Sequence, residues 1–167
     1  TKIKNINKYD MKKLLILGIL FLGYTASAQQ IAENAIGLRI GGNNGFGTEI
    51  SYQRALWDNN RLELDLGWKD SDEYDAYKIT GLYQWVWNID GGFNWYAGAG
   101  GGIGSWNSNR NLTNDGAYAF IAGDVGIEYS FDFPLQLSLD VRPEIGFDSG
   151  FNDDLDFDLA LGVRYQF

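Results

Sequence analysis

The sequence predicts an all-β fold, an eight-stranded antiparallel up-and-down β-barrel. The first observation is the strict alternation of residues 155–167, where every second residue is large and apolar and the others are polar or small. A period of two is typical of a strand with two different faces, because a helix would spread both sets around its axis. The second observation is that the same alternation recurs in seven upstream segments, in a chain with 22 Gly and only 2 Pro.

The first four strands are expected at residues 35–41, 46–56, 61–69 and 76–89. Their apolar faces carry, in chain order, Ile36, Leu38 and Ile40, then Ile50 and Tyr52, then Leu62, Leu64 and Leu66, then Ile79, Tyr83 and Trp85. Polar side chains fill most of the alternate positions. Because Gly, Asn and Asp favour turns, we expect turns at 42–45 and 58–60 and an acidic loop at 70–75.

The last four strands are expected at residues 93–104, 117–131, 135–147 and 155–167. Short turns at 90–92 and 132–134 alternate with longer polar loops at 105–116 and 148–154, of which 105–116 is the longest. Pro143 is a departure from the pattern, because Pro has no backbone N–H for a β-ladder. We expect a bulge there, or a position near the barrel rim.

Residues 11–28 have the features of a cleavable signal peptide. Lys12 and Lys13 precede an apolar run, which is too short to span a bilayer as a helix, and an A-x-A cleavage site ends at Ala28. A buried or membrane-anchoring helix is the alternative interpretation. The expected division is an upstream extension at 1–10, a signal peptide at 11–28 and a barrel domain at 29–167.

Two barrel types fit this alternation, a transmembrane barrel and a soluble ligand-binding barrel of the lipocalin or streptavidin type. The polar face of the fifth strand carries Gly98, Gly100, Gly102 and Gly104, which would make a poor water-exposed surface. Small residues are better explained as packing beside long ones inside a narrow barrel. The apolar face also holds too many large side chains for an eight-stranded core. A mean hydropathy of −0.25 is compatible with a transmembrane barrel, because only alternate residues meet lipid.

Aromatic residues gather near the ends of the predicted strands, and aliphatic residues occupy the middles. Trp and Tyr prefer the two membrane interfaces, so this distribution predicts two aromatic belts around a lipid-facing band. The predicted belt residues are Tyr52, Trp68, Tyr77, Tyr83, Trp85, Trp87, Phe93, Trp95, Tyr129, Phe131, Tyr165 and Phe167. The fold class is therefore refined to a transmembrane β-barrel.

From about residue 35 to its end, the chain resembles the small bacterial outer-membrane β-barrels of the OmpA/OmpX-like porin superfamily. The marks are the signal peptide, the eight alternating segments and the ending Tyr165, Gln166, Phe167, which is similar to the terminal aromatic signal of such barrels. The resemblance implies a Gram-negative outer membrane and contact with the barrel-assembly machinery through the strand that ends at Phe167. These marks indicate family and location better than function, because members of one fold do different things.

The inward face is expected to carry a network of charges. Its predicted members are Arg39, Glu49, Glu63, Asp65, Lys78, Asp124, Glu128, Asp140, Arg142, Glu144, Asp158 and Arg164. The simpler interpretation is a set of ion pairs that fills the lumen, since a buried charge is costly unless it is paired. The functional alternative is a cation path or gate. We expect Arg142 and Arg164 to be the central cations of the network.

Several kinds of chemistry are disfavoured. The chain has no Cys and no His, which removes thiolate and imidazole metal ligands and the commonest general base. The acidic sequences at 70–75 and 152–154 lack the EF-hand spacing, and the Gly-rich stretch at 98–104 does not match a nucleotide-binding motif. A net charge of −9 disfavours nucleic-acid binding. We expect no metal site, no cofactor and no enzymatic activity.

The expected function is that of a non-enzymatic integral outer-membrane protein, with a structural or surface-interaction role and a side-chain-filled lumen. The alternatives are a narrow porin-like channel for ions or small solutes and, less favoured, a soluble periplasmic ligand-binding barrel. We expect a monomer that contacts outer-membrane lipid. Both termini should face the periplasm, because the strand number is even and the chain ends on the side of the short turns.

Overall fold

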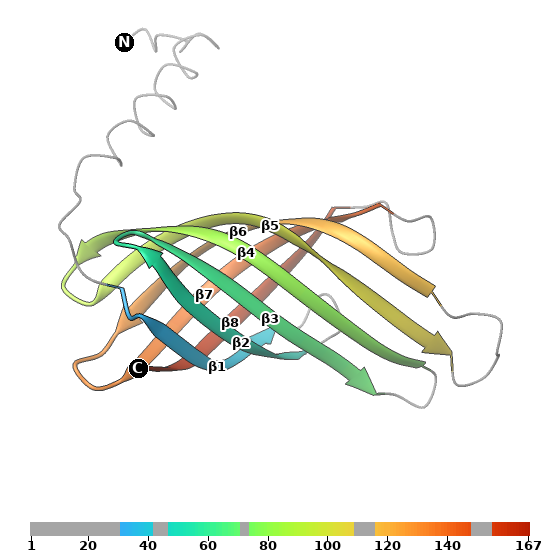
Figure 1. Cartoon of the computed structure of the whole chain (residues 1–167), viewed down its shortest axis with the longest axis horizontal. Helices are drawn as coiled ribbons and strands as arrows, with labels where there is room; N and C mark the ends of the chain where they lie inside the picture. Colours follow the sequence, from blue (N-terminus) through green and yellow to red (C-terminus); the bar gives the residue numbers. More distant parts are fainter. Residues whose placement is uncertain (1–30, 42–46, 71–73, 109–115, 148–154) are drawn as a thin grey trace, which may run out of the picture.

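The computed structural model describes residues 31–41, 47–70, 74–108, 116–147 and 155–167, which form a closed all-β barrel (Figure 1). The eight strands are β1 (Asn34–Gly41), β2 (Thr48–Trp57), β3 (Asn60–Asp70), β4 (Tyr74–Asp90), β5 (Phe93–Ser108), β6 (Gly116–Ser130), β7 (Leu135–Gly146) and β8 (Asp156–Gln166). Each strand is antiparallel to its neighbour in the chain, and β1 closes the barrel by pairing with β8. The predicted fold class is confirmed. Within these described ranges, no helix is long and apolar enough to cross a membrane.

The two ends of the barrel differ. Asn34 and Phe167 exchange backbone hydrogen bonds of 3.0 and 2.9 Å, so the first and last strands meet at one end. The short connections from β2 to β3, β4 to β5 and β6 to β7 lie at this same end (Figure 1). We call it the short-turn end, and the opposite end, where Gly41, Asp70 and Ser108 terminate their strands, the loop end.

Four strands, β3 to β6, extend further at the loop end than the sequence indicated. The predicted loop at 105–116 is wrong in extent, because β5 continues to Ser108 and β6 begins at Gly116. The extra pairs include Trp106 opposite Gly116, and the Trp106 ring packs 5.8 Å from that of Tyr118. This aromatic contact stabilises strand pairing in a polar sequence that otherwise reads as a loop.

Other predicted boundaries differ by a few residues, and some predictions concern undescribed parts of the chain. Asp70 belongs to β3 and β4 already begins at Tyr74, so the predicted loop at 70–75 is too long at both ends, and its middle, 71–73, lies outside the described residues. The extension at 1–10, the signal peptide at 11–28, the turn at 42–45 and the loop at 148–154 lie outside the described residues. They stay predictions.

Pro143 interrupts the β6–β7 ladder without shifting its register. Paired residues run to Ala122 opposite Glu144 and resume at Val125 opposite Val141. The gap covers Pro143 and its neighbour Arg142, while pairing of the same segment with β8 is continuous. The missing N–H of Pro143 is thus accommodated by a local break in the ladder rather than by a bulge.

The barrel has a polar inside and an apolar outside. Arg39, Glu63 and Asp140 are buried, whereas Leu38 and Leu139 stand on the outer surface with 43% and 46% of their area exposed. A soluble barrel would bury its aliphatic side chains, so the structure contradicts the soluble ligand-binding alternative. The exposed aliphatic band is the surface that a hydrocarbon environment requires.

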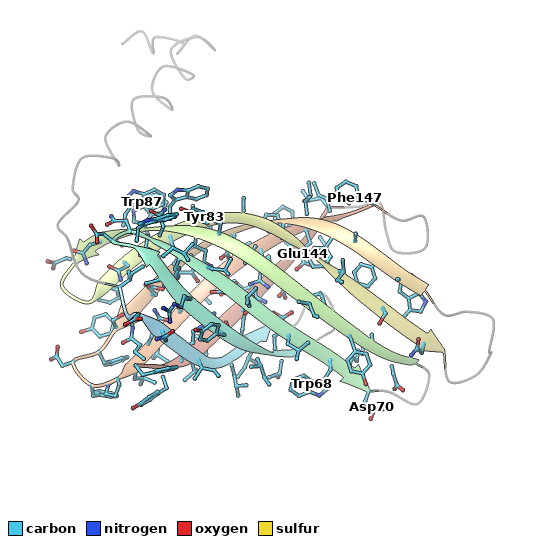
Figure 2. All side chains as sticks on the ribbon, viewed as in Figure 1. Trp68, Asp70, Tyr83, Trp87, Glu144 and Phe147 are labelled. Atoms are coloured by element: carbon cyan, nitrogen blue, oxygen red, sulfur yellow. The ribbon has the colours of Figure 1, made fainter. Side chains whose placement is uncertain are left out.

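Aromatic side chains cluster on the outside at the short-turn end (Figure 2). Trp87 stacks on Trp95 with ring centroids 4.3 Å apart, and the Phe93 ring lies 4.5 Å from that of Tyr129. None of the twelve predicted belt residues is buried. Trp57 and Phe133 are also exposed at this end and were missed, because each lies at or beyond the last predicted strand residue.

Inside the barrel, aromatic rings of one strand rest on glycines of the neighbouring strand. Tyr96 lies opposite Gly126, Tyr118 opposite Gly104, and Phe120 opposite Gly102, all between β5 and β6. A methyl group at any of these glycines would collide with the facing ring. The glycines of the polar face therefore make room for large inward rings, which agrees with the sequence argument that small residues pack beside long ones.

Candidate functional site in the barrel interior

The interior contains a connected network of charged side chains. Eleven of the twelve predicted members are fully buried, and the side chain of Glu144 keeps 12% of its area exposed. Side chains from both halves of the barrel meet here, because an eight-stranded barrel is narrow enough for opposite strands to touch through their long side chains. The alternation along each strand is what directs these residues inward.

Arg142 joins three strands across the lumen. Its guanidinium lies 2.6 Å from a carboxylate oxygen of Asp65, 3.0 Å from Glu63 and 3.3 Å from Glu49. The three carboxylates belong to β2 and β3, whereas Arg142 belongs to β7. Arg is suited to this position because its planar guanidinium presents several N–H donors at once.

Arg39 is a second cation of this kind. It pairs with Asp140 at 2.5 Å, Asp158 at 2.6 Å and Glu49 at 3.2 Å, and so links β1 to β7, β8 and β2. Arg39 was a predicted member of the network, whereas Arg164 was predicted to be one of its two central cations. In the structure, Arg39 contacts more carboxylates than Arg164 does.

Arg164 contacts one carboxylate and two hydroxyl groups. Its guanidinium donates hydrogen bonds to Ser51 at 3.0 Å and Ser138 at 2.8 Å, and its ion-pair partner is Glu63 at 3.2 Å. Arg164 is buried as predicted, but its guanidinium contacts fewer carboxylates than we expected for a central cation. The central pair of cations is therefore Arg39 and Arg142.

Glu63 accepts contacts from two arginines and two glutamines, and so connects Arg142 to Arg164, Gln53 and Gln84. It pairs with Arg142 and Arg164 and accepts hydrogen bonds from Gln53 at 2.6 Å and Gln84 at 3.2 Å. Charged and amide donors thus approach both of its oxygens. A buried carboxylate needs this saturation, because an unsatisfied one is strongly disfavoured.

Arg61 is a network member that the sequence analysis missed. It pairs with Glu128 at 2.7 Å, donates a hydrogen bond to Gln84 at 2.6 Å, and lies 4.8 Å from the centre of the Tyr96 ring. Its position at the first predicted residue of a strand, next to a turn, hid its inward orientation. Counting back by two from Glu63 would have identified it.

Lys78 closes the network toward the loop end. Its ammonium lies 2.9 Å from Glu144 and 3.2 Å from Glu49, and 5.5 Å from the centre of the Phe120 ring. Next to it lies an apolar cluster of Leu82, Tyr118, Phe120 and Ala122, with the partly buried Trp106 packed against that cluster. This cluster was not predicted, because only the polar residues of the inward face were considered as site candidates.

Acidic groups outnumber basic groups in the buried part of the described chain. The buried cations are Arg39, Arg61, Lys78, Arg142 and Arg164, and the buried carboxylates are Glu49, Glu63, Asp65, Asp124, Glu128, Asp140 and Asp158. Among the described residues, Asp124 has no Arg or Lys within ion-pair distance and is held by a short hydrogen bond from Gln84. Its second oxygen accepts no hydrogen bond, and the same is true of one oxygen each on Asp65 and Asp140.

In the described ranges, no group of three or more Asp and Glu side chains is arranged to hold a metal ion. The acidic sequences at 70–75 and 152–154 fall largely or wholly outside those ranges. The interior contains ion pairs and hydrogen bonds that connect different strands and join positions far apart in the chain.

The fold is that of small outer-membrane β-barrels. The N-terminal β-barrel domain of Pseudomonas aeruginosa OprF superposes with a TM-score of 0.64 at 18% identity, covering 83% of this chain and 100% of that one. Neisserial surface protein A gives a TM-score of 0.58 at 15% identity, covering 80% and 93%. The de novo designed protein TMB2.3 gives 0.50 at 17% identity, covering 83% and 96%. No protein-family model and no curated protein matches the sequence.

Proposed function

We propose that this chain is a non-enzymatic integral outer-membrane protein whose barrel is closed to solutes and serves to hold its loop end at the membrane surface. The observation that carries the proposal is the interior network. Arg39 and Arg142 each bind carboxylates on other strands, and an apolar cluster around Phe120 occupies a further part of the interior. A lumen occupied in this way leaves function to the exterior and the loops.

The proposed location is the outer membrane, with the short-turn end toward the periplasm. Support comes from the aliphatic band, the aromatic residues at both ends and the outer-membrane origin of the structural neighbours. Short turns in such barrels are periplasmic and longer loops extracellular. On this proposal the chain is a monomer in outer-membrane lipid, and the assembly machinery contacts β8 through its end at Phe167.

Ion conductance across a planar bilayer tests whether the barrel is closed to solutes. The refolded, inserted protein is expected to give a flat current trace at moderate voltage. Insertion is verified independently by the shift in gel mobility between the folded and the heated protein. Discrete current steps from inserted protein would contradict the proposal.

A second candidate function is a narrow cation-selective channel. One observation favours it, namely the surplus of buried carboxylates, with Asp124 lacking a cationic partner among the described residues. Rings of acidic side chains are a common basis of cation selectivity. If current steps occur, a reversal potential that favours cations and is reduced in D124N would establish this function instead.

A further inference from the structure

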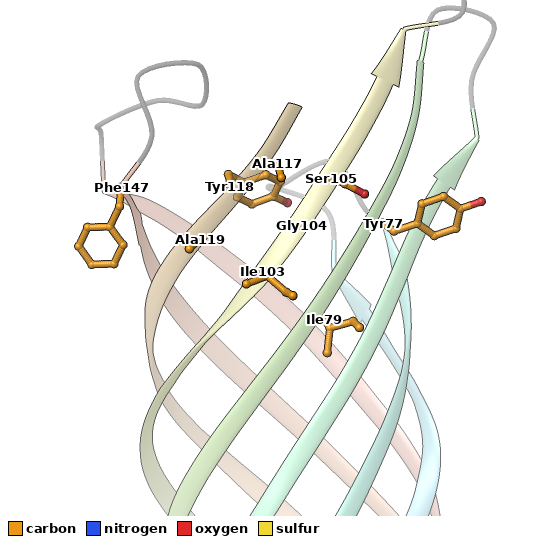
Figure 3. A pocket seen from close by; sticks show the side chains of 9 residues that line it. All are labelled: Tyr77, Ile79, Ile103, Gly104, Ser105, Ala117, Tyr118, Ala119 and Phe147. Carbon is orange, nitrogen blue, oxygen red and sulfur yellow. The ribbon is translucent and has the colours of Figure 1, made fainter. Parts of the chain in front are cut away.

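A groove opens on the outside of the barrel near the loop end (Figure 3). Its walls are Tyr77, Ile79, Ile103 and Phe147, whose side chains are all more than half exposed. Its volume is about 590 Å³, within the roughly 300–1,000 Å³ typical of small-molecule sites. No residue that lines it is charged.

The register of β4, β5 and β6 explains the shape of the groove. One row across the strands places Tyr77 of β4 opposite Ser105 of β5, which in turn faces Ala117 of β6. The next row places Ile79 opposite Ile103, and Ile103 opposite Ala119. Small side chains on β5 and β6 therefore form a floor between larger ones.

Phe147 completes the far wall. Its backbone N–H donates a 3.0 Å hydrogen bond to the carbonyl oxygen of Ala119, which places the Phe147 ring beside the floor (Figure 3). A recess with apolar walls and a small-residue floor gives a bound chain contact on several sides. The smooth outer surface of a barrel offers contact on one side only.

The position of the groove indicates what fills it. The groove is continuous with the exposed aliphatic band, which is the lipid-facing surface of the barrel. It reaches the level of the aromatic residues at the loop end, where Trp68 pairs with Tyr77. Aromatic belts mark the boundary between hydrocarbon and headgroups, so the groove begins at that boundary and runs into the hydrocarbon region.

We propose that this groove holds one acyl chain of a lipid from the membrane leaflet at the loop end. The proposal rests on membrane insertion of the barrel but not on whether its lumen conducts. The hydroxyl groups of Tyr77 and Ser105 lie on the rim side, where the ester end of the lipid belongs, and the chain runs past Ile79 and Ile103 (Figure 3). Uncharged walls match an uncharged hydrocarbon chain.

Lipid retention tests the proposal. The protein is refolded in dimyristoylphosphatidylcholine vesicles, transferred to a mild detergent and examined by native mass spectrometry. We expect a monomer that retains one phospholipid. Filling the floor with A119W should lower the retained fraction roughly tenfold, equivalent to about 1.4 kcal/mol of binding free energy. A117F fills the same floor and guards against a folding defect particular to one variant.

The matched control is A99W, which makes the same substitution on the lipid-facing side of β5 outside the groove. Retention should be unchanged in this variant. Free myristate should displace the lipid, and glycerophosphocholine, which has the headgroup alone, should not. Equal retention in A119W, A117F and A99W would overturn the proposal, as would absence of bound lipid on the parent protein or a dimer disrupted by A119W. None of these three results bears on membrane insertion or conductance. The proposed function is therefore tested separately, by the conductance experiment.

Discussion

At the scale of single residues, the interior is organised by a few arginines that each satisfy several carboxylates. Arg142 has no exposed area and lies within 3.3 Å of three acidic side chains. Removing one partner of a buried pair is costly, because the remaining charges stay buried without compensation. The stability of the barrel should therefore depend more on Arg142 than on any exposed arginine.

The substitution R142A tests this dependence. We expect it to lower the free energy of unfolding by about 3–5 kcal/mol, because Glu49, Glu63 and Asp65 lose a shared partner. The measurement is urea unfolding in lipid vesicles, followed by tryptophan fluorescence.

The matched control is R54A. Arg54 pairs with Glu33 at 3.2 Å, but its side chain is 49% exposed, so the expected loss is only about 0–1 kcal/mol. Similar unfolding midpoints for R142A and R54A would show that the interior ion pairs do not hold the barrel together.

Replacing Asp124, unlike replacing Arg142, should not lower the stability of the barrel. Since it has no cationic partner among the described residues, D124N removes a buried charge and keeps a group that can hydrogen-bond to Gln84. We expect an unchanged or raised unfolding midpoint. In D65N the midpoint should fall, because Asp65 pairs with Arg142 at 2.6 Å. A larger loss in D124N than in D65N would indicate that Asp124 has a cationic partner, such as a bound ion.

The sequence could identify these residues but not their pairing. Alternation along each strand assigned Glu63, Asp65 and Arg142 to the interior, because the period of two follows from local geometry. Which carboxylate meets which arginine depends on the stagger between strands and on barrel closure, which are properties of the whole sheet. For the same reason Arg164 was ranked above Arg39.

At the scale of elements, β5 and β6 are matched by rings resting on glycines. A methyl group at Gly126 would lie 2.5 Å from the Tyr96 ring and 2.8 Å from the carbonyl oxygen of Leu139. Cross-strand pairs of this kind stabilise sheets and fix register. The polar sequence after Gly104 concealed the extension of β5, because the packing of Trp106 on Tyr118 is a contact between strands.

The substitution G126A should destabilise the barrel by about 1–3 kcal/mol, because the new methyl group overpacks the space below Tyr96. Its control is G81A, where the nearest atom to a new methyl group is a Leu64 carbon at 3.5 Å, an ordinary contact. G81A should be neutral or stabilising by up to about 1 kcal/mol. The unfolding midpoints of the two variants check the difference, and equal midpoints would refute the ring-on-glycine account.

At the scale of the whole molecule, the barrel separates a polar interior from a lipid-facing exterior. A charge on the exterior should be tolerated according to its depth in the membrane. Leu139 lies in the aliphatic band, whereas Leu135 begins β7 at the short-turn end. The same substitution at both positions therefore reports on depth.

L139R should make folding into vesicles less favourable by about 2–4 kcal/mol, and L135R by about 0–1 kcal/mol. The measurement is the equilibrium folded fraction in urea, read from gel mobility. A larger penalty at Leu135 than at Leu139 would mean that the membrane is not centred on the aliphatic band.

The inside-out, closed barrel is tested most directly by single-cysteine accessibility, since the chain contains no Cys. Ser138 and Leu139 are adjacent, yet Ser138 is buried against Arg164 and Leu139 faces outward. In vesicles, the cysteine of L139C should react with a lipid-soluble thiol reagent and not with a water-soluble one. The cysteine of S138C should react with neither until the barrel is unfolded, while D58C, in an exposed turn, reacts with the water-soluble reagent throughout. Rapid reaction of folded S138C with the water-soluble reagent would reveal an open lumen, and such reaction of L139C would place the outer face in water; either result would contradict the structure's account of the protein.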